Sequence, residues 1–398
     1  MKHQFQTDEN TLILPFSNLS PRPRFQTNRY ERWSEEEHRK SIYDVKLSEN
    51  QNVAIQEQVH VIPDQVHVIP DQVHVQNDDA VFADLEDLGT VAKEVMKLEF
   101  VKNHCYEKDV YRYAVVTGAN KGIGYGICKK LALHGVVVVL TARNEKRGLE
   151  AVERLKEFSL SDSVVFHQLD VTDPSSVTSL ADFIKTRFGK LDILVNNAGV
   201  PGGIVNGENY LRRKKGEILD WNLIVHQNYE LAKECVETDF FGSERVTEAL
   251  LPLLQLSTSP RIVNISGQIG LLKHIPNEWA RGVFGDIENL TNEKLYEVLR
   301  EFLKDYKEGS LESKNWPPVV SGVTMAKAGI NAYTRMLAKK FPHFCINCIC
   351  PGSVKTDMNH NQGLLSIDEG VENPVRLALL PDHGPSGLFF SIDQVIPF

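Results

Sequence analysis

The sequence predicts an α/β protein built on a doubly wound parallel sheet, with a low-complexity tail before it. The first indication is an apolar strand at 113–117 that runs into a glycine-rich turn and then a helix. The second is the alternation of apolar strands with helical segments, which is typical of parallel sheets with right-handed crossovers. The expected strands are 113–117, 136–140, 164–169, 191–195, 261–265, 344–349 and 388–390. Ligands of such folds bind beyond the carboxyl ends of the strands.

Composition and charge argue against several classes of function. The chain has 398 residues and a formal net charge of −9, so it lacks the basic character of a nucleic-acid-binding protein. Its longest strongly apolar run, 135–142, is too short to span a bilayer, and no signal-peptide pattern is visible. Six cysteines are compatible with reduced thiols in a cytoplasmic setting. We therefore expect a cytoplasmic protein with no nucleic-acid or membrane partner.

Residues 1–108 differ in character from the rest of the chain. The seven-residue unit QVHVIPD is repeated over 58–78, with the third copy degenerate. Three such units cannot bury a core, so we interpret 1–108 as a disordered tail. His60, His67 and His74 recur every seven residues, but no scaffold or further ligand accompanies them, and no metal site is predicted. Residues 109–398 are expected to form the folded domain.

The turn at 118–124 predicts a dinucleotide-binding site. Its glycines follow the spacing Gly-x-x-x-Gly-x-Gly, which lets backbone N–H groups approach a pyrophosphate at the N-terminus of the next helix. The buried face of that helix is expected to contain Ile127, Leu131 and Leu133. The predicted cofactor-binding residues of the turn are Gly118, Asn120, Lys121, Gly122, Ile123 and Gly124.

The end of the second strand indicates which dinucleotide binds. NAD enzymes usually carry a carboxylate here, which hydrogen-bonds the ribose 2′-hydroxyl. This chain has Arg143 instead, with Lys146 and Arg147 close behind it. A guanidinium matches a phosphate with a planar set of donors, whereas a carboxylate would repel it. The predicted cofactor is therefore NADP(H), with Arg143 and Arg147 among its ligands.

Several motifs together make residues 109–398 resemble the short-chain dehydrogenase/reductase family. They are 117–124, Leu169-Asp170-Val171, Asn196-Asn197-Ala198-Gly199, 261–264 and Pro351-Gly352. The motifs at 279–282, 316–318, 331–335 and 384–387 make the chain similar to the plant salutaridine reductase and neomenthol dehydrogenase group, and to the monomeric carbonyl reductases.

The resemblance implies a Rossmann-type fold and a set of cofactor contacts. In the family, the residues at Asp170 and Val171 contact the adenine, and those at Asn197, Ala198 and Gly199 line the cofactor. The loop that holds the nicotinamide end corresponds here to Pro351, Gly352, Val354 and Thr356.

The resemblance also implies a catalytic tetrad, and three of its four positions are altered. The family uses a Tyr proton donor, a Lys four residues later, a Ser that polarises the carbonyl, and an Asn on the preceding helix. Lys327 is retained, but Val323, Gly267 and Asp239 stand at the positions of the Tyr, Ser and Asn.

Neighbouring hydroxyls are not expected to replace the missing ones. Ser266 is adjacent to Gly267, but strand alternation points it away unless the end of the strand rotates. Ser321 and Thr324 flank Val323, and neither shares its face of the helix.

The interval of about 268–318 is predicted to form a helical flap. Residues 292–307 show an amphipathic pattern with apolar Leu295, Val298, Leu299, Phe302 and Leu303. The resemblance implies that this insertion covers the substrate pocket and a surface used elsewhere for oligomerisation, so a monomer with an apolar, lidded pocket is expected. The alternative is a stabilising helix with no substrate role.

These observations predict an NADP(H)-dependent oxidoreductase that acts on a small apolar compound, terpenoid-like or alkaloid-like. The accepting group is a carbonyl or an activated C=C bond, which needs less help from a Tyr acid because water can supply the proton. A second hypothesis is a pseudoenzyme that binds NADP(H) and serves a binding or regulatory role. The altered tetrad favours the second hypothesis.

Overall fold

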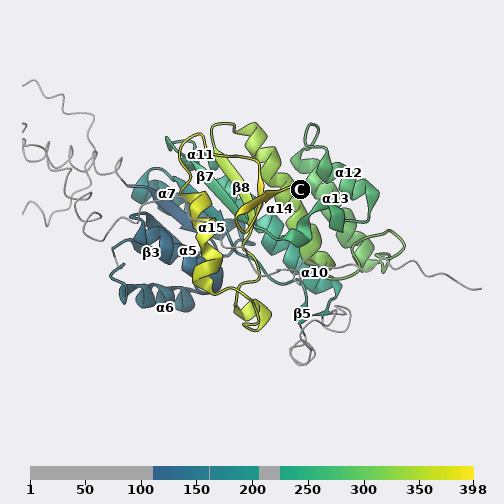
Figure 1. Cartoon of the computed structure of the whole chain (residues 1–398), viewed down its shortest axis with the longest axis horizontal. Helices are drawn as coiled ribbons and strands as arrows, with labels where there is room; N and C mark the ends of the chain where they lie inside the picture. The colour runs from purple at the N-terminus through teal and green to yellow at the C-terminus, as the bar shows by residue number, and fades with distance from the viewer. Residues whose placement is uncertain (1–110, 161, 206–224) are drawn as a thin grey trace, which may run out of the picture. The chain divides into compact units, whose positions relative to one another are not determined.

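An eight-stranded sheet forms the centre of the protein (Figure 1). The computed structural model describes residues 111–160, 162–205 and 225–398, so the predicted tail and its repeat lie outside the described residues. The strand order is β10-β9-β8-β7-β4-β1-β2-β3. The strands are β1 (Tyr113–Val116), β2 (Val137–Ala142), β3 (Val164–Gln168), β4 (Ile193–Asn196), β7 (Arg261–Ile265), β8 (Cys345–Cys350), β9 (Phe389–Ser391) and β10 (Gln394–Ile396). The predicted α/β fold class is confirmed.

All pairings in this sheet are parallel except that of β10 with β9, which is antiparallel. Each predicted strand is present within two residues of its expected ends, whereas β10 was not predicted. A separate two-stranded sheet joins β5 (Ile204–Val205) and β6 (Val225–His226). The order of the large sheet reverses between β1 and β4, and a ligand of this fold class binds at such a switch point.

Helices cover both faces of the sheet, which explains why its strands are continuously apolar. One hydrophobic cluster joins the sheet to α5 (Gly122–Leu133), α6 (Glu145–Lys156) and α15 (Ile367–Ala378). A second cluster on the opposite face contains α7 (Pro174–Phe188), α11 (Gly242–Leu254) and α14 (Ser321–Lys340). The carboxyl ends of the strands are thus the positions where polar side chains can meet.

A π-helical segment interrupts the long helical stretch before β7. It is η3 (Val236–Phe241), placed directly between α10 (Tyr229–Cys235) and α11. Such i→i+5 segments are rare and occur often at functional sites. Asp239, predicted at the position of the family Asn, lies within η3 and is buried.

The predicted flap helix forms as α13 (Asn292–Lys307), and Figure 1 shows it with α12 (Glu278–Gly285) beside α14. Thr291 caps α13 by accepting a hydrogen bond from the Lys294 N–H. Four of the five predicted apolar residues, Leu295, Val298, Leu299 and Phe302, are fully buried in the cluster that contains α14. The flap therefore extends the core over the helix that carries Lys327.

The cysteines of β8 lie as strand alternation predicts. Cys345 belongs to the cluster of α5 and α15, whereas Cys348 and Cys350 are buried in a small cluster with Phe389. Burial raises the pKa of the Cys350 thiol. Cys345, Cys348 and Cys350 are free, buried thiols that pack as small apolar groups. No helix in the described part of the chain has the length and apolar character needed to cross a membrane.

The predicted buried face of α5 is wrong at one position. Ile127 and Leu131 are fully buried, whereas Leu133 is 56% exposed. Positions 127 and 131 are four residues apart and share a face, but two residues rotate a helix by about 200°. Leu133 therefore ends the helix on its solvent side.

The two leucines of α5 provide a matched test of this packing. We expect Leu131→Ala to lower the free energy of unfolding by about 2–5 kcal/mol, because it leaves a cavity in the core. Leu133→Ala should change it by less than about 0.5 kcal/mol. Urea unfolding of the two variants measures the difference, and similar losses would contradict the described orientation of α5.

Candidate cofactor and active site

The glycine-rich turn forms a cradle that admits only backbone. Gly118 and Gly122 have φ values of 62° and 60°, a left-handed conformation that glycine adopts without strain. A Cβ on Gly118 would lie 2.8 Å from Ala198 Cα, and one on Gly124 would lie 2.9 Å from Ala119 Cα. Because α5 begins at Gly122, its free N–H groups point towards this cradle. The arrangement fits the pyrophosphate of a dinucleotide.

Thr117 and Asn197 fasten this cradle to the neighbouring strand. The Thr117 hydroxyl oxygen accepts hydrogen bonds from the N–H groups of Asn197 and Ala198, both at 2.9 Å. The Asn197 side chain donates to the carbonyls of Thr117 (2.8 Å) and Gly118 (3.1 Å). The predicted residues of the turn and of the 197–199 segment are thus brought together at the switch point between β1 and β4.

Two basic side chains connect the turn to other parts of the fold, and the sequence pattern did not indicate one of them, Arg154. Arg154 of α6 donates a hydrogen bond to the Asn120 carbonyl at 2.8 Å and stacks over the Tyr125 ring at 4.9 Å. Nothing in the local pattern links it to a turn 34 residues earlier. Lys121 forms an exposed ion pair with Asp357 at 2.8 Å, which connects the turn to the loop that follows Gly352.

Arg143 directly follows β2, and Arg147 lies in the first turn of α6, where the sequence predicted a phosphate site. Both side chains are exposed. Asn144 caps α6 by accepting a hydrogen bond from the Arg147 N–H at 3.0 Å, so both guanidinium groups lie near a helix N-terminus. Cations are unfavourable there without a bound anion, and a 2′-phosphate would compensate them.

The residues expected at the two ends of the cofactor flank the same edge of the sheet. Val171 is buried, and its carbonyl accepts a hydrogen bond from Arg245 at 2.7 Å; Asp170 accepts from the Thr172 N–H at 2.9 Å. In the loop after β8, Gly352 has a φ of 87° and Val354 is buried. A Cβ on Gly122 would lie 3.5 Å from Thr356 Cγ2, so this loop contacts the turn.

Lys327 and Asp239 form a buried ion pair. The Lys327 ammonium lies 2.9 Å from Asp239 Oδ2 and donates a hydrogen bond to the Ile265 carbonyl at 3.1 Å. Asp239 Oδ1 accepts a hydrogen bond from the Val200 N–H at 2.7 Å. Burial raises the pKa of the Asp239 carboxyl, while Lys327 and the Val200 N–H oppose that rise. The pair joins η3, α14, the end of β7 and the segment after β4.

The hydroxyls near the tetrad positions form hydrogen bonds with other groups. Ser266 donates to Asn331 Oδ1 at 2.6 Å, so it points towards the interior of α14, as strand alternation indicates. Thr324 donates to the Val320 carbonyl at 3.0 Å, and Ser321 lies 3.1 Å from Gln227 Oε1. Neither hydroxyl takes the place of a phenol at position 323.

The positions of Val323 and Gly267 leave the site without a donor of their own. Val323 is half-buried at the start of α14, where its backbone N lies 3.1 Å from a Cβ built on Gly202. Gly267 has an extended backbone, and a Cβ there would come no closer than 3.6 Å to Ile269 Cγ2. A serine at 267 would therefore fit without strain.

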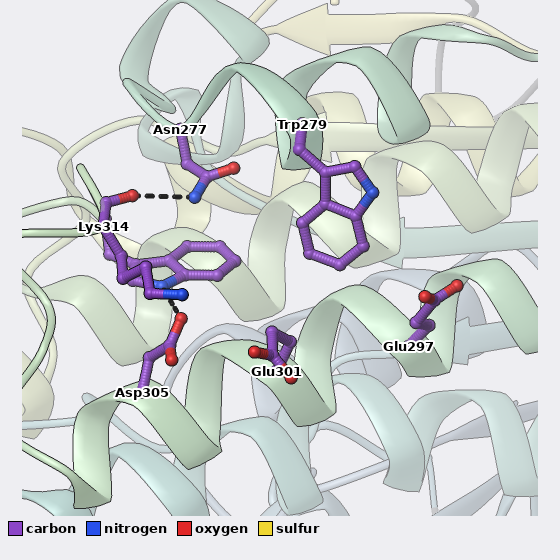
Figure 2. Close-up of a pocket in the computed structure, with 7 residues that line it drawn as sticks. Asn277, Trp279, Glu297, Glu301, Asp305 and Lys314 are labelled. Carbon is purple, nitrogen blue, oxygen red and sulfur yellow. Dashed lines mark hydrogen bonds between the residues drawn. The ribbon is translucent and has the colours of Figure 1, made fainter.

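Figure 2 shows a pocket on the flap that is distinct from this site. The carboxylates of Glu297, Glu301 and Asp305 follow one another along α13, opposite the Trp279 indole, and Asn277 donates to the Lys314 carbonyl at 2.8 Å. None of the predicted cofactor or tetrad residues lines it. Its acidic lining does not match the apolar pocket expected for the substrate.

The glycine cradle at the switch point defines a dinucleotide-binding α/β protein, and comparisons identify its family. Residues 112–278 match the family model described as short chain dehydrogenase. The chain is 56% identical over 291 residues to (+)-neomenthol dehydrogenase of Arabidopsis thaliana, covering 72% of this chain and 98% of that one. The chain therefore belongs to the short-chain dehydrogenase family.

Two further relatives extend the comparison. The solved structure of salutaridine reductase from Papaver somniferum has a TM-score of 0.66 and 50% identity, covering 70% of this chain and 99% of that one. Carbonyl reductase [NADPH] 1 of Rattus norvegicus is more distant, at 36% identity over 296 residues, covering 72% of this chain and 98% of the relative. The resemblance expected from the motifs is confirmed.

The buried ion pair yields a stability test. We expect Lys327→Met to lower the free energy of unfolding by about 3–5 kcal/mol at pH 8, because Asp239 is left buried without its counter-ion. The double variant Lys327→Met/Asp239→Asn should recover most of this loss. Chemical unfolding measures both.

The decrease in the free energy of unfolding caused by Lys327→Met should also be smaller at pH 5.5 than at pH 8. Without Lys327, the pKa of Asp239 rises further above its unfolded value, so the folded state binds a proton that the unfolded state releases. Stability then falls as the pH rises. If Lys327→Met and Lys327→Met/Asp239→Asn lose the same free energy of unfolding, and the loss does not change with pH, the ion pair is contradicted.

Proposed function

We propose that the protein binds NADP(H) and reduces an activated C=C bond in a small apolar compound, rather than an ordinary ketone. The observation that carries the proposal is a contrast within one site. The glycine cradle and Lys327 are in place, whereas Val323 and Gly267 supply neither a phenol nor a hydroxyl to a carbonyl oxygen.

The choice of NADP(H) rests on charge. Arg143 and Arg147 are exposed next to the N-terminus of α6, and guanidinium groups bind phosphate well. Relatives include a carbonyl reductase named for NADPH. When bound, the reduced cofactor supplies a hydride from C4 of its nicotinamide ring.

The protein's own residues would then position the cofactor and shield the reaction. Lys327 would hold the ribose next to the nicotinamide, and the loop from Pro351 to Thr356 would support the ring. In a C=C reduction the β carbon of the conjugated bond would accept a hydride, the electron pair of that bond would pass to the carbonyl as an enolate, and water would protonate the α carbon. This route avoids protonation of a carbonyl oxygen, the step that the missing Tyr performs in the family.

The substrate class is inferred from the relatives, which are named for neomenthol, salutaridine and carbonyl substrates. These names support a small terpenoid-like or alkaloid-like compound. The apolar face of α13 is buried against α14, so it supports a monomeric protein with the flap packed onto its own core and contributes nothing to the choice of substrate.

A second candidate function is binding without turnover. It is favoured by the engagement of the Ser266, Ser321 and Thr324 hydroxyls with other groups. Single-turnover NADPH oxidation against matched cyclic ketones and enones separates the two functions. NADPH oxidation that depends on the enone supports C=C reduction. A compound that changes the fluorescence of bound NADPH while the NADPH stays reduced supports binding without turnover.

Cofactor choice can be tested at Arg143. We expect calorimetry to give a much tighter Kd for NADPH than for NADH, because the guanidinium meets the 2′-phosphate. Arg143→Asp should weaken NADPH binding by about tenfold or more while leaving NADH binding within about threefold. Arg187→Asp, an exposed arginine near the C-terminus of α7, is the charge-matched control. Equal affinities for the two cofactors in the unmodified protein would refute the assignment.

The altered tetrad can be tested by restoring it. Ketone reduction by the unmodified protein should be negligible, since loss of a general acid alone costs about 10²–10⁴ in rate. Val323→Tyr or Gly267→Ser alone should help little, because residues that act as a unit are strongly non-additive. Val323→Tyr/Gly267→Ser should gain more than the two single changes combined.

Asp239→Asn should then be needed for the full gain, because Asp239 holds the Lys327 ammonium at 2.9 Å. The initial rate of NADPH oxidation with a cyclic ketone is the measurement for all these variants. Brisk ketone reduction by the unmodified protein would show that another group donates the proton.

A further inference from the structure

Among the described residues, two acceptors engage the three N–H donors of the Lys327 ammonium. One donates to the Ile265 carbonyl at 3.1 Å, and another to Asp239 Oδ2 at 2.9 Å. A single donor remains for the cofactor ribose. The pair lies directly behind the cofactor-lining segment, since a Cβ on Gly199 would be 2.8 Å from Asp239 Oδ2.

Burial raises the pKa of the Asp239 carboxyl, and its hydrogen-bond contacts oppose that rise. Within the described part of the chain, its carboxylate accepts from Lys327 and from the Val200 N–H, and donors of this kind stabilise a carboxylate. The two charges of the ion pair lie 2.9 Å apart and cancel, so the pair carries no net charge.

We infer that Asp239 shifts the preference of the site towards the oxidised cofactor, an inference that rests on the proposed NADP(H) binding. The nicotinamide ring is positively charged in NADP⁺ and neutral in NADPH. With a neutral residue at 239, Lys327 would leave one positive charge that repels the oxidised ring. Asp239 cancels that charge inside a buried site, where screening by water is weak.

The test compares two affinities in one protein. Calorimetry gives Kd for NADP⁺ and for NADPH, and the ratio of the two removes effects that act on both forms equally. In Asp239→Asn we expect the ratio Kd(NADP⁺)/Kd(NADPH) to rise by about tenfold. Asp239→Ser, a smaller neutral variant, should give the same direction of change if asparagine perturbs folding.

Two further variants control for charge and position. Asp239→Asn/Lys327→Gln removes both charges and should return the ratio to within about twofold of the unmodified protein. Glu288→Gln makes the same change of charge where Glu288 pairs with Lys339, at the opposite end of α14, and should leave the ratio unchanged. If neither cofactor form binds the unmodified protein, the proposed function is wrong. If both cofactor forms bind, and neither Asp239→Asn nor Asp239→Ser changes the ratio Kd(NADP⁺)/Kd(NADPH), then Asp239 does not set the preference between the two forms.

Discussion

The buried ion pair between Lys327 and Asp239 is the constraint on which the arrangement of the active site depends. It joins α14 to the π-helical segment η3, while the same two side chains also hold the Ile265 and Val200 backbones. A buried charge without a partner is costly. The ion pair therefore fixes the positions of α14, η3 and the backbones at Ile265 and Val200 relative to one another. This one side-chain pair thus organises the fold around it.

The two halves of the site obey different physical rules. The cofactor half is built from backbone: glycines that a Cβ would disrupt, and N–H groups at the start of α5. It depends little on which side chains surround it. In the family the reacting half depends on hydroxyls, and the residues expected at those positions here, Val323 and Gly267, have none. A chain can therefore keep the backbone of a dinucleotide site while the side chains that carry proton chemistry change, and the proposed function rests on that separation.

The flap contributes to this arrangement through packing. Leu295, Leu299 and Phe302 are fully buried in the same core as α14, and Trp316 donates a hydrogen bond to the buried Asp305 carboxylate at 2.8 Å. This packing steadies the helix on which Lys327 is mounted. The outer side of α13 instead carries the acidic pocket of Figure 2, so its two sides differ in chemistry, as its amphipathic pattern indicates.

The sequence by itself determined the fold class, the glycine cradle and α13, because each follows from local spacing: apolar runs, a glycine pattern and a helical period. Tertiary structure alone decided that Asp239 Oδ2 meets Lys327 at 2.9 Å and that Arg154 holds the Asn120 carbonyl. Those partners lie 88 and 34 residues apart, and local periodicity carries no information on contacts at such separations. The same limit explains β10, a three-residue strand that is defined by its pairing with β9.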